Sequence, residues 1–265
     1  MGSATRFYDI RSVLQDRTRI TKALIANVLV PPLVTGVLIA LLPMSDAVAT
    51  VMFLLAFAPG GINAVQFSTK AHGQLALAGA MLFLLSILGV ILAFLAKNVI
   101  LPDGGTAALP AGELAFRIIG LVLAPLIAGV LTQAYAPQLA AKAYKPAMLV
   151  STLSFVASVV LSLGVRQDAL GAIETPALVA MLLFILILMG TGWILGGPEP
   201  EQRQVLAVTT NLRNVGLVYV LVDGCCNGDA HTFVVLAFMA LMVPCNLVLT
   251  IVCAVARKRR NRLVK

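Results

Sequence analysis

Charged residues are scarce in this chain. Only 11% of its 265 residues are Asp, Glu, Lys or Arg, whereas soluble domains carry about 25%. Hydrophobic residues instead make up 60% of the sequence, and the mean hydropathy is +1.00. This composition excludes a soluble globular protein. It predicts an all-α polytopic membrane protein embedded in the lipid bilayer, because a helix satisfies its backbone polar groups internally.

Histidine and cysteine are also scarce, which argues against metal and redox chemistry. His72 and His231 lie in predicted loops, and neither has a second ligand nearby. No predicted span combines a nucleophile with a base, so an intramembrane enzyme is not favoured, and no catalytic or metal-binding residue is assigned. The cysteines lack metal-ligand spacing, and the adjacent pair is better interpreted as thiols in apolar surroundings than as a redox pair: Cys225, Cys226, Cys245 and Cys253.

Long apolar runs dominate the rest of the chain. Windows of about 20 residues predict eight membrane spans. They cover residues 23–42, 47–66, 74–96, 118–135, 147–164, 176–195, 205–222 and 232–256. We therefore divide the chain into a basic N-terminal segment (1–22), a transmembrane transporter domain (23–256) and a basic tail (257–265). Residues 1–22 contain no apolar run, so we expect no signal peptide.

Lys and Arg are distributed unequally between the two sides of the predicted membrane domain. With both termini placed in the cytoplasm, fifteen of them fall in inner segments and three in outer loops, at Lys97, Arg117 and Arg166. This bias predicts cytoplasmic termini and, with the family resemblance below, a bacterial inner membrane protein. The tail sequence RKRRNR is then best explained as a cytoplasmic topology anchor, with an anionic-lipid or nucleic-acid patch as the alternative. No nucleic-acid partner is assigned.

The second span is interrupted near its middle. Pro59, Gly60 and Gly61 predict a break there, since proline removes a backbone donor and paired glycines tolerate unwinding. Asn63 and Gln66 follow at spacing i, i+3 and would share a helix face. The alternative is a simple kink, but buried amides in lipid need partners, and a substrate-filled or water-filled cavity would provide them.

The seventh span carries polar residues at its centre. Thr210, Arg213 and Asn214 stand at i, i+3 and i+4, so a continuous helix would place them on one face. An arginine at mid-span costs roughly 2.5–3.5 kcal/mol on insertion scales and is usually functional. No acidic residue lies in a span core to pair with it. Carbonyls of an unwound helix, Asn and Thr side chains, or a bound anion must therefore accept its hydrogen bonds, and we expect it to face an anion or a cavity.

Two interrupted polar spans indicate the substrate site of a transporter. The segments Pro59-Gly60-Gly61-Ile62-Asn63 and Thr209–Leu217 resemble the two broken helices of the bile acid:sodium symporter family, in a divergent bacterial branch. Other segments also resemble the family's sequence, including LIANVLVPPLV at residues 24–34 and LAPLIAGVL at residues 123–131. The resemblance implies discontinuous helices that cross, an inverted repeat that is only partial here, and a transport function.

The chain departs from the family pattern in two ways. The family has ten spans, and this sequence is expected to lack the first two. The family's sodium ligands are also largely replaced: Ala64-Val65 stand for a Ser-Asn pair, Thr209 for a Glu and Arg213 for a Gln. A fixed guanidinium repels sodium by several kcal/mol in a low-dielectric site.

These observations predict a transporter of small organic anions that works by alternating access. Asn63, Gln66, Thr210, Arg213 and Asn214 would bind substrate, and Arg213 would act as a tethered cation in place of sodium. No cofactor is assigned, and Na⁺ binding and a homo-oligomer are left open. The rival prediction is a transport-inactive membrane receptor or assembly subunit that has the same fold.

Overall fold

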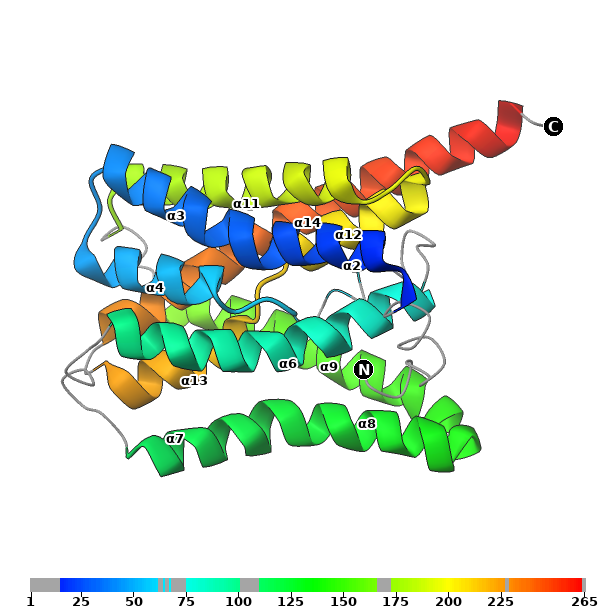
Figure 1. The fold of residues 1–265 in the computed structure, drawn as a ribbon, viewed down its shortest axis with the longest axis horizontal. Coiled ribbons are helices and arrows are strands. Elements are labelled where there is room, and N and C mark those ends of the chain that lie inside the picture. The colour runs from blue at the N-terminus through cyan, green and yellow to red at the C-terminus, as the bar shows by residue number, and fades with distance from the viewer. Residues whose placement is uncertain are drawn as a thin grey trace.

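The structure is a computed structural model that describes residues 15–61, 64, 67, 75–100, 110–165, 173–226 and 229–263. All regular structure in these ranges is helical (Figure 1). The elements are α2 (Arg17–Leu24), the π-helix η2 (Ile25–Leu29), α3 (Val30–Leu41), α4 (Asp46–Ala56), α6 (Leu75–Ile100), α7 (Ala111–Ile118), the π-helix η3 (Ile119–Leu123), α8 (Ala124–Tyr135), α9 (Pro137–Val165), α11 (Thr175–Leu195), α12 (Pro200–Asn211), α13 (Val215–Cys225) and α14 (Asp229–Leu263).

The all-α polytopic architecture is confirmed. Within the described ranges, six helical stretches are long and apolar enough to cross a membrane by length and composition. Two predicted spans are not among the six. Residues 147–164 lie within the longer α9, and residues 47–66 begin as α4, which stops at Ala56 where the Pro-Gly-Gly break starts.

Several helices extend beyond the predicted spans. The first begins at Arg17, where the Asp16 side chain caps it by accepting a 3.0 Å hydrogen bond from the Arg19 backbone N–H. The last continues through the basic tail to Leu263 and projects beyond the bundle in Figure 1. Basic residues favour this extension because they place positive charge near a helix C-terminus and at the headgroup level of the bilayer.

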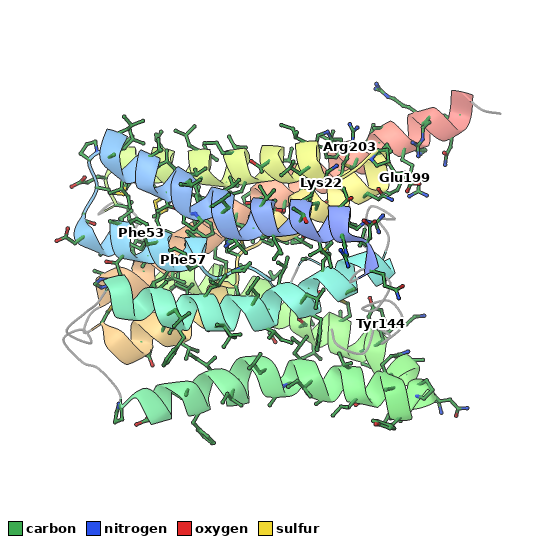
Figure 2. The ribbon with its side chains drawn as sticks, in the orientation of Figure 1. Lys22, Phe53, Phe57, Tyr144, Glu199 and Arg203 are labelled. Atoms are coloured by element: carbon green, nitrogen blue, oxygen red, sulfur yellow. The ribbon has the colours of Figure 1, made fainter. Side chains whose placement is uncertain are left out.

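The core lies where α4, α11, α13 and α14 pack together. Its largest members include Phe184 and Phe238, whose rings meet edge to face with centroids 6.0 Å apart. Large apolar side chains also cover the outer surface, for example Leu41 and Phe116, which are 73% and 77% exposed. Figure 2 shows Lys22, Glu199 and Arg203 at the same end of the bundle as the C-terminal end of α14. An apolar outer surface with charged ends is the arrangement that a bilayer requires.

Helices α7, η3 and α8 form a long rod along one edge of the molecule, and α9 packs against α8 (Figure 1). This hairpin meets the rest of the protein through contacts of α7 with α13 and of α9 with α14. The Arg117 guanidinium on α7 also forms an ion pair with Asp223 on α13, at an N–O distance of 3.2 Å. We call these elements the α7–α9 hairpin.

Candidate functional site

The two interrupted spans meet at their breaks. The chain leaves α4 at Phe57 and leaves α12 at Leu212, and two backbone hydrogen bonds then join the irregular segments. The Gly61 N–H donates to the Leu212 carbonyl and the Asn214 N–H donates to the Ala58 carbonyl, both at 2.8 Å. The two predicted interruptions therefore lie against each other. Each break thus pairs backbone groups that the other span leaves without an intrahelical partner where its helix is interrupted.

The glycines of the first break are required by close packing. Gly60 has a φ of +87°, a conformation that side chains rarely adopt. A Cβ atom on Gly61 would overlap the Leu212 carbonyl, so only glycine allows the two breaks to hydrogen-bond. On the opposite side, Gly89 of α6 makes room for the Pro59 carbonyl. The Pro59-Gly60-Gly61 motif thus fits between α6 and the second break.

Arg213 lies at the centre of this crossing and is only 1% exposed. Its Nε donates to the Leu55 carbonyl at 2.8 Å and its Nη2 donates to the Ala56 carbonyl at 2.5 Å. Longer hydrogen bonds of 3.4 and 3.3 Å run from Nη1 to the Thr210 carbonyl and from Nη2 to the Asn27 carbonyl. The guanidinium therefore binds backbone oxygens from three separate helical segments. The sequence analysis left three kinds of acceptor open for Arg213: carbonyls of an unwound helix, Asn and Thr side chains, or a bound anion. In the structure the acceptors are backbone carbonyls.

Each of these carbonyls is available because a helix ends or because a proline removes its usual donor. Leu55 and Ala56 close α4, and Thr210 belongs to the last turn of α12, so these oxygens are at the negative ends of two helix dipoles. The Asn27 carbonyl would normally accept from residue 31 or 32, and both residues are prolines without an N–H. A buried positive charge at this point stabilises two helix C-termini at once.

The structure corrects one prediction about the second break. Thr210, Arg213 and Asn214 do not share a helix face, because the helix ends at Asn211 and the chain is irregular through Asn214. They nevertheless lie together at the crossing. The Asn214 side chain starts the next half-helix as an N-cap, with Oδ1 accepting from the Leu217 N–H at 3.1 Å.

Two further residues belong to the site and were not predicted. Asn27 lies in the π-helical turn, and its Nδ2 donates to Thr210 Oγ1 at 3.2 Å. Turns of this kind occur frequently at functional sites. Asn211 is fully buried, and within the described part of the chain neither its Nδ2 nor its Oδ1 has a hydrogen-bond partner. Asn214 Nδ2 and Asn27 Oδ1 are also buried, and no described residue forms a hydrogen bond with either atom. Such orphaned polar atoms are costly unless a ligand or water satisfies them.

Asn63 and Gln66, the other predicted site residues, lie outside the described residues. Their neighbours Ala64 and Phe67 are buried, at 0% and 7% exposure. The described part of the site therefore consists of the first break, the second break and the π-helical turn of the first span.

Comparison with models of known protein families identifies the family of this chain. The model of the Sodium Bile acid symporter family matches residues 1–193, which include the first break and end within α11. The chain belongs to the sodium bile acid symporter family. A search among curated proteins found no match. Members of this family are membrane transporters, so this chain is a membrane transporter of the bile acid symporter type.

The family's description names sodium, but the described part of the crossing already holds a positive charge, that of Arg213. Sodium needs a cluster of oxygen ligands, and the carbonyl oxygens gathered here already bind the guanidinium of Arg213. Thr209, which stands where the family resemblance places a carboxylate, donates its hydroxyl to the Val205 carbonyl at 2.9 Å, within its own helix. At the described part of the crossing, the positive charge comes from the chain itself.

Proposed function

We propose that this transporter moves small organic anions by alternating access around the crossing, and that Arg213 takes the place of a coupling sodium ion. The observation that carries the proposal is the guanidinium at the crossing, which is buried and bound to four backbone carbonyls. The negative ends of these helix dipoles would otherwise attract a mobile cation. Here they are neutralised by the guanidinium of Arg213, which is covalently attached to the chain. In this proposal sodium does not bind at this position, so a sodium gradient cannot drive transport through it.

The charge and the unpartnered amides support an anionic substrate. At an effective dielectric constant of about 20, a carboxylate about 8 Å from a guanidinium is attracted by about 2 kcal/mol. The positive end of the α13 dipole points at the same break and adds to this attraction. Asn211 and Asn214 offer buried N–H donors without partners. Arg213 would attract the anion through space, and the asparagines, with Asn63 and Gln66, would contact it.

The packing supports a division into two moving parts. The helices around the crossing are tied to one another by Arg213 and by the two backbone hydrogen bonds between the breaks. The α7–α9 hairpin meets them through α7 with α13 and α9 with α14, including the exposed Arg117–Asp223 ion pair. Exposed ion pairs contribute roughly 0.2–1 kcal/mol, which a rocking motion can overcome. The charge bias supports a bacterial inner membrane location with both termini in the cytoplasm.

Uptake into proteoliposomes tests this proposal directly. The purified protein would be given a panel of labelled organic anions, namely a bile acid, a sulfonated steroid and a short keto acid, with a sodium gradient or a matched choline gradient. We expect saturable uptake of at least one anion at equal rates in both gradients. Uptake that requires sodium would overturn the proposed role of Arg213. Tight binding without uptake would instead identify a receptor.

A further inference from the structure

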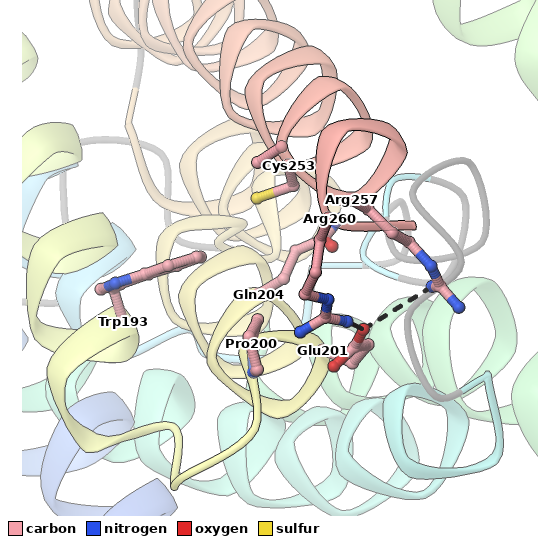
Figure 3. Close-up of a pocket in the computed structure, with 8 residues that line it drawn as sticks. Trp193, Pro200, Glu201, Gln204, Cys253, Arg257 and Arg260 are labelled. Atoms are coloured by element: carbon pink, nitrogen blue, oxygen red, sulfur yellow. Dashed lines mark hydrogen bonds and ion pairs between the residues drawn. The ribbon is translucent and has the colours of Figure 1, made fainter. Parts of the chain in front are cut away.

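A pocket of about 270 Å³ lies away from the crossing, between α11, the start of α12 and the end of α14 (Figure 3). Its apolar wall includes Trp193, Cys253 and Ala256, and Pro200 closes one side. The charge distribution predicts that this end of the bundle faces the cytoplasm. Trp193 is the single tryptophan of the chain, and tryptophans are enriched at the depth of the lipid headgroups.

The pocket has a net positive charge. Glu201 Oε1 is 2.7 Å from Arg260 Nη2 and 3.9 Å from Arg257 Nη1, so two guanidinium groups share one carboxylate oxygen. Figure 3 shows this arrangement at the rim. Among the described residues that line the pocket, these two positive charges and one negative charge give a formal net charge of +1. The side chains of Arg257 and Arg260 are 35% and 53% exposed, which leaves them accessible from the headgroup region.

A buried amide also lines this pocket. Gln204 is one helical turn beyond Pro200 on α12 and is only 2% exposed, yet its Nε2 has no hydrogen-bond partner among the described residues. A buried donor without an acceptor is destabilising, so a ligand that accepts this hydrogen bond is favoured. The pocket therefore combines an unused buried donor, two guanidinium groups and an apolar wall.

We propose that this pocket binds an anionic phospholipid. The lipid phosphate would accept hydrogen bonds from the Arg257 and Arg260 guanidinium groups and from Gln204 Nε2, and the start of its acyl chains would lie against Trp193. Guanidinium groups match the geometry of phosphate oxygens. The apolar wall and the position at headgroup depth favour a lipid over a soluble phosphate ester. The site is separate from the transport function proposed above.

Trp193 provides the measurement. The full-length protein would be reconstituted in phosphatidylcholine containing a minor fraction of brominated phosphatidylglycerol or, in parallel, the same fraction of brominated phosphatidylcholine. Bromine quenches tryptophan at short range, so the ratio of quenching reports enrichment of the anionic lipid beside Trp193. We expect clear enrichment in the unsubstituted protein. Equal quenching by both lipids would overturn the proposal.

Two variants test the pocket in opposite directions. The double substitution Arg257→Gln/Arg260→Gln should reduce the enrichment roughly fivefold to thirtyfold, because each basic side chain near an anionic surface contributes about fivefold in affinity. Glu201→Gln should increase it, which a misfolded variant would not do. The matched control Lys258→Gln/Arg259→Gln removes two charges from the same helix outside the pocket and should retain most of the enrichment.

Three further outcomes are decisive. If the control double variant loses as much enrichment as the pocket variant, diffuse surface charge is responsible and the pocket proposal is wrong. Gln204→Leu should weaken the enrichment while leaving the exposed charges intact, and an unchanged value would remove the amide from the site. If soluble glycerol phosphate competes away the brominated lipid, the ligand is a soluble phosphate ester and the lipid assignment fails.

Discussion

Replacing Arg213 with glutamine removes the buried positive charge at the crossing and keeps a polar side chain. The guanidinium makes two short hydrogen bonds, to the Leu55 carbonyl at 2.8 Å and the Ala56 carbonyl at 2.5 Å. A hydrogen bond to a charged group contributes about 1.5–3 kcal/mol, so the two together contribute about 3–6 kcal/mol. A glutamine amide can restore one neutral bond of about 1 kcal/mol. The expected net loss is therefore about 2–5 kcal/mol.

The loss is measurable as a lower melting temperature of the purified protein in detergent. For a chain of this size, 1 kcal/mol corresponds to about 2–4 °C, so Arg213→Gln should melt about 4–20 °C lower than the unsubstituted protein. Arg203→Gln is the matched control, because Arg203 lies on α12, which leads into the second break, and its Nε donates to one carbonyl, that of Gly197, at 2.8 Å. By the same reasoning that substitution should cost about 0.5–2 kcal/mol.

Sodium distinguishes a tethered cation from an ordinary structural arginine. In Arg213→Gln the carbonyls of two helix C-termini lose their positive partner and become ligands for a small cation. We expect sodium chloride, compared with choline chloride at equal ionic strength, to raise the melting temperature of this variant. Occupancy at about ten times the dissociation constant would add about 1.4 kcal/mol. The unsubstituted protein and Arg203→Gln should melt at the same temperature in both salts.

Two results would refute this reasoning. An unchanged melting temperature of Arg213→Gln would show that the guanidinium does not hold the helix ends together. Stabilisation of the unsubstituted protein by sodium over choline would show that a sodium site exists beside the guanidinium, and the argument that one cation replaces the other would fail.

Further predictions concern the breaks and the hairpin. Gly61→Ala places a methyl group against the second break, so it should abolish uptake and lower the melting temperature, whereas Gly36→Ala, with nothing within 4 Å of the added Cβ, should preserve both. Asn211→Leu removes two buried, unpartnered polar atoms, so it should leave stability equal or higher while uptake falls at least tenfold; retained uptake would exclude Asn211 from the site. In a double-mutant cycle measured by melting, Arg117→Ala and Asp223→Ala should show a coupling of about 0.2–1 kcal/mol. Both single variants should raise the uptake rate if the hairpin rocks, and equal rates would argue against that motion.

The first break was predictable from sequence because its cause is local. Proline and paired glycines disrupt a helix wherever they stand, and Pro59, Gly60 and Gly61 do so here. The second break has no such residues between Thr209 and Val215. It was predicted from the polar centre of that span and from the family resemblance, and not from a local helix-breaking residue. Its cause is tertiary. The Leu212 carbonyl and the Asn214 N–H bond to the first break rather than within a helix, and sequence periodicity cannot reveal that exchange.

Asn27 shows the same limitation more clearly. One asparagine in an apolar span gives a weak signal, and its partner Thr210 is 183 residues away. The local cue was the proline pair at residues 31 and 32, which removes both N–H groups that the Asn27 carbonyl would use in an α-helix or a π-helix. The sequence predicted that a mid-span arginine needs carbonyl or anionic partners. It did not indicate that a carbonyl freed by prolines in another span would supply one of them.

A cation fixed to the chain has consequences for the energetics of transport. A coupling ion contributes energy because it binds from one side of the membrane and is released to the other. Arg213 does neither, since its guanidinium is covalently attached and bound to the carbonyls of two helix ends. If the proposed role of Arg213 holds, the energy for net uptake comes from the substrate gradient, from the membrane potential acting on the anion, or from exchange against another anion. Preloading proteoliposomes with unlabelled substrate separates these cases: acceleration of labelled uptake identifies exchange, and an unchanged rate that varies with membrane potential identifies facilitated diffusion of the charged species.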